Sequence, residues 1–99
     1  MAAYLIANYN ITNLEGFLAY VEQAGPIVAA YGGKHLVAGP GSEIIEGSPN
    51  KVTVVIEFPS MGKLKGWYNS PEYQAIIPMR TDNTEGSLVF ANQYVSEPE

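Results

Sequence analysis

The chain has 99 residues, of which 46% are apolar and 15% charged, and its net charge at neutral pH is −5. This length and composition are typical of one globular domain and exclude a disordered chain. Cysteine is absent and His35 is the single histidine, so disulfides, thiolate metal sites and sites of several histidines within one chain are excluded. No acidic cluster follows a calcium-loop pattern, so we expect neither a metal ion nor a cofactor.

The five basic residues are scattered along the chain rather than clustered. Nucleic acids and anionic membranes both attract clustered Lys and Arg, so we expect neither as a partner. No apolar run approaches the ~20 residues of a membrane span. The first residues, MAAYLIANYN, lack the basic start of a signal peptide. We therefore expect a soluble, cytoplasmic protein.

The first two elements are predicted as a strand and a helix. Residues 3–9, AYLIANY, alternate in the manner of a half-buried strand. Thr12 stands three residues before Glu15, which is the spacing of a capping box, so we expect a helix to begin at Thr12.

This first helix is predicted to be interrupted. Pro26 lacks the N–H that would bond to the carbonyl of Glu22, so a kink or break is expected at Gly25–Pro26, followed by further turns through Tyr31. Two glycines follow at 32–33, and they predict the end of the helix because glycine adopts the left-handed conformation readily.

Three further strands are predicted from β-branched or alternating runs. KVTVVIEF is the strongest of them, and EIIEG reads only as a short extended piece or as the other arm of the KHLVA strand. The predicted strands cover residues 34–38, 51–58 and 87–95, and the short extended piece covers 43–47.

The stretch between residues 60 and 80 is predicted to form two short helices. Ser60 is expected to cap the first helix, and Ser70 to cap the second with Pro71 at its first position. Pro78 is expected to kink or end the second helix. We interpret the aromatic side chains of this corner as core residues first and as a binding site second.

The order of elements, βαββαβ, predicts an α+β protein of ferredoxin-like fold, a four-stranded antiparallel sheet with helices on one face. Residues 1–95 would form a single domain and 96–99 an acidic C-terminal tail. The sheet face away from the helices would carry Tyr4, Ile6, Thr53 and Val55. That face is too apolar to be left in water, so we expect a homodimer in which two sheets pack face to face.

Three long segments, AYLIANYNITNLEGFLAY, PIVAAYGGKHLVAGPG and VVIEFPSMGKLKGWYNSPEYQA, together cover most of the chain. With them the chain resembles the bacterial family catalogued as domain of unknown function 1330, within the dimeric α+β barrel superfamily. The run IIPMR departs from the family pattern. The resemblance implies the fold and the dimer, and it implies no activity. The wider superfamily includes cofactor-free monooxygenases, isomerases and haem enzymes, which is an analogy of fold alone.

Two residues are candidates for acid–base chemistry. His35 has the side chain whose unperturbed pKa lies nearest neutrality, and it is either a half-buried strand histidine or a proton acceptor for a bound substrate. Glu57 places a carboxylate in an apolar strand, where it either reaches solvent at the strand end or acts as an acid or base.

Further residues are candidates for contact with a ligand. Arg80 either binds a carboxylate with two hydrogen bonds or complements the dipole at the end of its helix. Asn8 would orient a ligand from the sheet. The complete set of ligand-binding candidates is Asn8, Tyr31, Trp67, Tyr73 and Arg80.

Two functions of different class remain open. In the first, the protein binds or converts a small, largely apolar organic molecule without a metal ion. In the second, it is a structural or interaction dimer without ligand or activity. A pocket of ~300 Å³ or more with His35 or Glu57 on its wall favours the first, and a solidly packed sheet interface favours the second.

Overall fold

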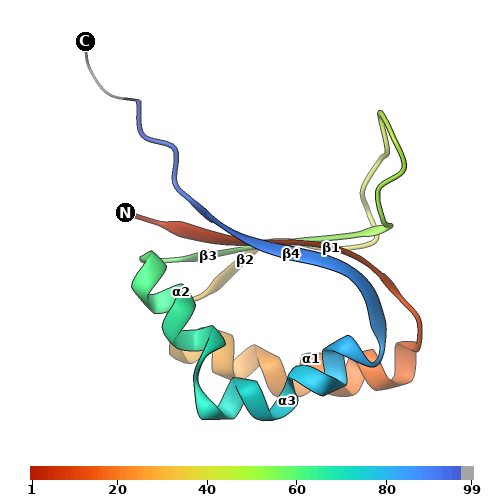
Figure 1. Cartoon of the computed structure of the whole chain (residues 1–99), viewed down its shortest axis with the longest axis horizontal. Helices are drawn as coiled ribbons and strands as arrows, with labels where there is room; N and C mark the ends of the chain where they lie inside the picture. The colour runs from red at the N-terminus through yellow and green to blue at the C-terminus, as the bar shows by residue number, and fades with distance from the viewer. Residues whose placement is uncertain (97–99) are drawn as a thin grey trace.

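The four strands and three helices follow the predicted order. The computed structural model describes residues 1–96, so most of the predicted acidic tail lies outside the described residues. The elements are β1 (Ala3–Ile11), α1 (Leu14–Ala30), β2 (Lys34–Gly39), β3 (Val52–Phe58), α2 (Met61–Tyr68), α3 (Pro71–Thr81) and β4 (Thr84–Asn92). The sheet is antiparallel with the order β2-β3-β1-β4, and all helices lie on one of its faces (Figure 1). This confirms the predicted ferredoxin-like fold.

Alternation along the two central strands decides which side chains meet the helices. Leu5 of β1 pairs with Ile56 of β3, and both are buried on the helix face. Ile6 pairs with Val55 on the other face, which we call the outer face. The buried core therefore lies between the sheet and the helices, and it includes Trp67 and Tyr73 among its largest side chains.

Helix α1 differs from the prediction at its start. Its N-cap is Asn13, whose side-chain oxygen accepts from the backbone N–H of Gly16 at 3.5 Å, so the prediction of Thr12 is wrong. Thr12 still belongs to the incoming connection, because its backbone N–H donates to the carbonyl of Asn83 at 2.9 Å.

The two internal prolines do not end their helices. Helix α1 runs through Pro26 to Ala30, and α3 runs through Pro78 to Thr81, so neither helix breaks or ends at its proline. Of the two alternatives predicted for each proline, a break or end is wrong and a kink stays a prediction. Both prolines are exposed. The carbonyl that each leaves without an intrahelical donor can therefore be hydrated, which limits the cost of the missing hydrogen bond.

The predicted caps of the two short helices are confirmed. The Ser60 hydroxyl accepts from the N–H of Lys63 at 3.1 Å, and the Ser70 hydroxyl accepts from the N–H of Tyr73 at 3.2 Å. Pro71 occupies the first turn of α3. The corner between α2 and α3 is thus defined by its local sequence, and it brings Trp67 and Tyr73 together in the core.

Residues 40–51 form a long arm between β2 and β3 on the side of the sheet away from the helices (Figure 1). The segment 43–47, predicted as extended, contains no strand. The base of the arm is tied to β1, because the Asn8 side-chain oxygen accepts from the Asn50 N–H at 2.8 Å and the Asn8 amide donates to the Asn50 carbonyl at 3.1 Å.

The last strand lies earlier than predicted. The prediction was 87–95, whereas β4 begins at Thr84, which pairs with Ile11, and ends at Asn92. Gly86 has φ +154° and packs directly against the backbone of β1. The start of this strand therefore contains a glycine where the prediction relied on a β-branched pattern.

Replacing Gly32 with alanine should lower the free energy of unfolding by about 1 kcal/mol or more. Gly32 follows the C-cap of α1 with φ +80°, and an added Cβ would approach the Pro59 ring to 2.9 Å. The control is Gly66→Ala inside α2, where an added Cβ would make only ordinary contact with Tyr31, at 3.7 Å. That change should stabilise the protein by up to about 1 kcal/mol. Urea unfolding of both variants measures the difference, and equal effects would contradict it.

Candidate functional site

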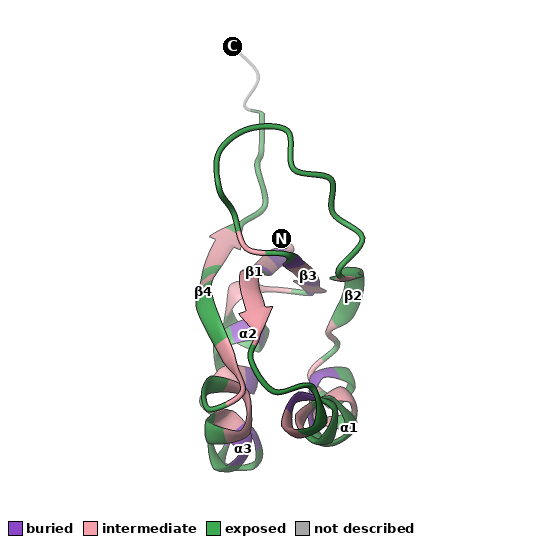
Figure 2. Cartoon of the chain, turned by 90° about the vertical axis from the view of Figure 1, so that its right-hand side faces the viewer, coloured by how far each residue is buried: buried purple, intermediate pink, exposed green. Residues whose placement is uncertain are grey.

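A cavity of about 710 Å³ lies between the sheet and the helices. Its walls come from all four strands and from all three helices, and they are mostly apolar. Seen end-on, α1 and α3 run side by side beneath the sheet (Figure 2). The volume lies within the ~300–1,000 Å³ typical of pockets for small organic ligands.

One opening of the cavity lies along the edge of the sheet between α1 and β2. Leu18 and Val21 of α1 line the cavity and are exposed. His35 and Ala38 of the edge strand β2 also line it and are exposed. Because exposed lining residues mark where a cavity meets solvent, a ligand can enter here and pass His35 at the opening.

Three polar side chains meet on the helix side of the cavity. The hydroxyl groups of Tyr20 on α1 and Tyr73 on α3 lie 2.6 Å apart, and either can donate to the other. The Nε–H of Arg80, two turns after Tyr73 on α3, donates to the Tyr73 hydroxyl at 3.3 Å. This network joins the two long helices and places a cation on the cavity wall.

Burial and contact with one another shift the pKa values of the tyrosine and arginine side chains on the cavity wall. Burial, assisted by Tyr73, raises the pKa of Tyr20 far above its usual value of 10.0. Burial also raises the pKa of Tyr9 on β1, although the charge of Arg80 opposes this shift. Burial lowers the pKa of Arg80, but the neighbouring tyrosines, Tyr73 first, outweigh it and the pKa is raised. Near neutral pH Tyr20 is therefore a neutral phenol and Arg80 a cation.

Trp67 forms the buried end of the cavity. Its ring is 1% exposed and lies between the rings of Phe58 and Tyr73, with centroid separations of 5.4 and 4.1 Å. The indole Nε1–H is buried and has no acceptor among the described residues. A buried donor without a partner is uncommon, because it costs about 1–3 kcal/mol.

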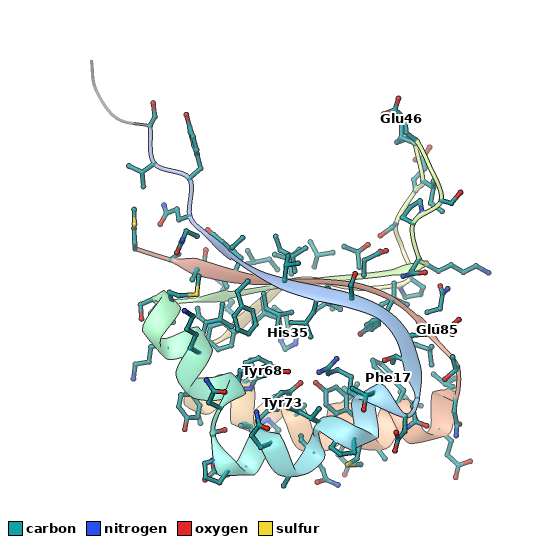
Figure 3. All side chains as sticks on the ribbon, in the orientation of Figure 1. Phe17, His35, Glu46, Tyr68, Tyr73 and Glu85 are labelled. Atoms are coloured by element: carbon teal, nitrogen blue, oxygen red, sulfur yellow. The ribbon has the colours of Figure 1, made fainter. Side chains whose placement is uncertain are left out.

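Four of the residues predicted for a site line this one cavity: His35, Trp67, Tyr73 and Arg80. In Figure 3, His35 of β2 lies beneath the sheet and Tyr73 of α3 lies on the helix side. Both side chains line the cavity. The sequence-based interpretation of Trp67 and Tyr73 as core is also supported, since both are 1% exposed.

The other three predicted residues lie elsewhere. Glu57 is on the outer face, where its carboxylate accepts from the Tyr4 hydroxyl at 3.1 Å. Asn8 is on the same face and its amide holds the arm. Tyr31 contacts a shallow depression at the end of α1 instead of the cavity. Within one chain, the sheet separates Glu57 from His35, so the predicted acid–base pair is not assembled.

Tyr20 and Tyr9 are the cavity residues that the sequence analysis missed. Tyr20 stands three residues after Phe17, a spacing that puts both on one face of a helix, and the two rings are 5.9 Å apart. Tyr9 alternates with Asn8 along β1, and its ring lies 5.6 Å from Phe17. The helical period therefore placed Tyr20 on the same face as Phe17, and the strand alternation placed Tyr9 on the face opposite to Asn8.

Within residues 1–96, no group of three or more His, Cys, Asp and Glu side chains is placed to hold a metal ion. In the same part of the chain, no helix has both the length and the apolar character needed to cross a bilayer.

The arrangement defines an α+β protein of ferredoxin-like fold with a largely apolar cavity between its sheet and its helices. The chain belongs to the family described as domain of unknown function (DUF1330), whose model matches residues 2–94. No curated protein matches the chain in sequence.

Solved structures share the fold at low sequence identity. A protein of unknown function from Rhodopseudomonas palustris superimposes with a TM-score of 0.79 at 16% identity, over 96% of this chain and 84% of that one. SnoaB, a cofactor-independent oxygenase from Streptomyces nogalater, gives 0.63 at 8% identity, over 99% and 98%. A dimeric protein of unknown function and ferredoxin-like fold from Bacteroides fragilis gives 0.53 at 14% identity, over 93% and 96%. These likenesses confirm the fold.

Tyr20 should make the protein less stable at high pH. Its pKa is raised in the folded state, so its contribution is fully present below its unfolded pKa of about 10 and is lost as pH rises above that value. The loss should approach about 1.4 kcal/mol per pH unit. Urea unfolding between pH 8 and about pH 11 measures it, and Tyr20→Phe should flatten the curve. Tyr94→Phe, at an exposed position, is the control. An unchanged slope in Tyr20→Phe would contradict the assignment.

Proposed function

We propose that this chain binds a small, largely apolar organic molecule, without a metal ion, in the cavity between its sheet and its helices. The cavity itself carries the proposal. A chain of this size buries only roughly 60–68% of its unfolded surface. The open cavity of about 710 Å³ leaves mostly apolar wall in contact with water, which a bound apolar molecule would cover. A ligand with a ring system would fit this volume.

The polar groups of the cavity support chemistry on that molecule. His35 lies at the opening and can accept a proton from a bound molecule, while Arg80 and the tyrosines can stabilise a developing negative charge. SnoaB shows that this fold is compatible with cofactor-independent oxygenation, which at 8% identity is an analogy of fold. We therefore place any proton transfer at His35.

The outer face of the sheet supports a homodimer. The registers align Val37, Val55, Ile6 and Val89 in one row across all four strands. Polar residues lie on both sides of this row, including Glu57 in one direction and Asn8 in the other. An apolar row with polar flanks suits a two-fold interface, and a neighbour of the same fold is described as dimeric. We propose that two chains pack through this face.

The alternative, a dimer without ligand or activity, shares the interface but leaves the cavity unexplained. The dimer face and the cavity lie on opposite sides of the sheet, so the two features are independent. The sequence-based criterion, a pocket of ~300 Å³ or more with His35 on its wall, is met.

The binding proposal is tested with N-phenyl-1-naphthylamine, an uncharged apolar dye whose fluorescence rises in apolar surroundings. Ala38 lies at the opening of the cavity, so Ala38→Phe should narrow the entrance and weaken dye binding about tenfold or more. Leu36→Phe is the matched control, because Leu36 lies on the same strand and is exposed without lining the cavity. Binding that is equal in both variants, or absent from the unaltered protein, would overturn the proposal.

A further inference from the structure

We infer that the ligand of this cavity carries an anionic oxygen, a carboxylate or an enolate, on its apolar body, and that Arg80 binds that oxygen. This inference rests on the proposed function and specifies the chemical class of the ligand. It follows from the guanidinium donors of Arg80, which the described residues leave without an anionic acceptor on the cavity wall.

Arg80 brings a positive charge to an apolar cavity without a carboxylate beside it. Its Nε–H donates to the Tyr73 hydroxyl, and this is its one side-chain hydrogen bond within residues 1–96. The groups that raise its pKa are tyrosines, Tyr73 first, and its charge also acts on Tyr9. Its two terminal NH₂ groups therefore have no protein anion to bind. A half-buried guanidinium in that state favours an anion from outside the chain.

Tyr73 and Tyr20 hold Arg80 on the cavity wall. The Arg80 Nε lies 3.3 Å from the Tyr73 hydroxyl. Tyr20 fixes that hydroxyl from the opposite helix at 2.6 Å. The anionic oxygen of a ligand would therefore bind the terminal NH₂ groups of Arg80 beside these two hydroxyl groups.

The rest of the cavity defines the remainder of the ligand. The wall is otherwise mostly apolar. Glu85 is an acidic lining residue on β4. Figure 3 shows it at the far end of the sheet from Tyr73. An amphipathic molecule with its anionic group at Tyr73 and its apolar body along the sheet matches this distribution. The planar guanidinium favours a carboxylate or an enolate, which present oxygen acceptors in one plane.

Displacement of N-phenyl-1-naphthylamine by matched ligands tests this inference. The ligands are 1-naphthoate, its uncharged analogue 1-naphthamide, and 2-hydroxy-1,4-naphthoquinone, which is an enolate at neutral pH. We expect 1-naphthoate to bind about 10–100-fold more tightly than 1-naphthamide, the range of a charge-assisted hydrogen bond. The protein's net charge of −5 opposes nonspecific attraction of anions, so a preference for naphthoate reports a local site. Comparison of naphthoate with the quinone distinguishes a carboxylate ligand from an enolate.

Substitutions test whether Arg80 binds the anionic group of the ligand. Arg80→Gln should abolish the preference for 1-naphthoate, whereas Arg80→Lys, which keeps the charge, should retain part of it. Lys65→Gln on the exposed side of α2 removes the same charge away from the cavity and should leave the preference unchanged. Circular dichroism verifies that each variant is folded, and Arg80→Lys keeps the test decisive if Arg80→Gln unfolds.

The outcomes separate the two proposals. If the dye does not bind at all, the proposed function fails. If the dye binds and 1-naphthamide displaces it as well as 1-naphthoate does, the function stands and the anionic ligand is refuted. A preference for naphthoate that survives Arg80→Gln in the folded variant would also refute it.

Discussion

Replacing Trp67 with alanine should lower the free energy of unfolding by about 3–5 kcal/mol. The ring is 1% exposed and packs between Phe58 of β3 and Tyr73 of α3, so its removal leaves a void where the sheet meets the α2–α3 corner. Part of the loss is offset, because the variant no longer buries an indole N–H without an acceptor. Urea unfolding, followed by far-ultraviolet circular dichroism because Trp67 is the chain's one tryptophan, measures the change.

The control for this change is Tyr94→Ala, which removes a large ring that is 86% exposed. It should alter the free energy of unfolding by less than about 0.5 kcal/mol. If Trp67→Ala were as harmless as Tyr94→Ala, the ring would not be a core residue, and the α2–α3 corner would be a binding surface only.

Introducing a charge on the outer face should convert the proposed dimer to a monomer. Val89 belongs to the apolar row across the sheet and is 55% exposed in the single chain. In Val89→Asp, a two-fold interface would bury two carboxylates without partners, which costs several kcal/mol for each. Light scattering at micromolar concentration should give twice 10.7 kDa for the unaltered protein and 10.7 kDa for the variant.

Leu14→Asp is the matched control for the dimer. Leu14 is 59% exposed and lies on the helix side of the sheet, at the first turn of α1, where an acidic residue is compatible with the helix dipole. This variant should remain a dimer. A monomer mass for the unaltered protein at micromolar concentration, or dissociation of Leu14→Asp alone, would contradict an interface through the outer face.

The fold could be predicted because the alternation in the central strands is strong. In β3, Val52, Ile56 and Phe58 all fall on the buried face, and β1 repeats this pattern. The errors arose where one local signal was given too much weight. Asn13 competes with Thr12 for the N-cap, and an exposed Pro26 costs the helix less than a buried one would.

The candidate site could be predicted only in part. Tyr73 and Arg80 are seven residues apart on one helix, so their shared face followed from the helical period. The contact of Tyr20 with Tyr73 depends on α1 packing beside α3, a tertiary arrangement to which no local pattern points. Strand β2 has an irregularity between His35 and Val37. Because of it His35 faces the helices while Val37 faces outward, and no pattern in the sequence showed that Glu57 and His35 would lie on opposite faces.

A crystal structure of the protein grown with 1-naphthoate tests the central claim most directly. The account predicts density for the naphthalene ring between the sheet and helices α1 and α3, with the carboxylate within hydrogen-bond distance of Arg80. A structure in which Leu18 and Val21 close against β2 and the space is filled by protein side chains, with no naphthoate inside, would contradict it.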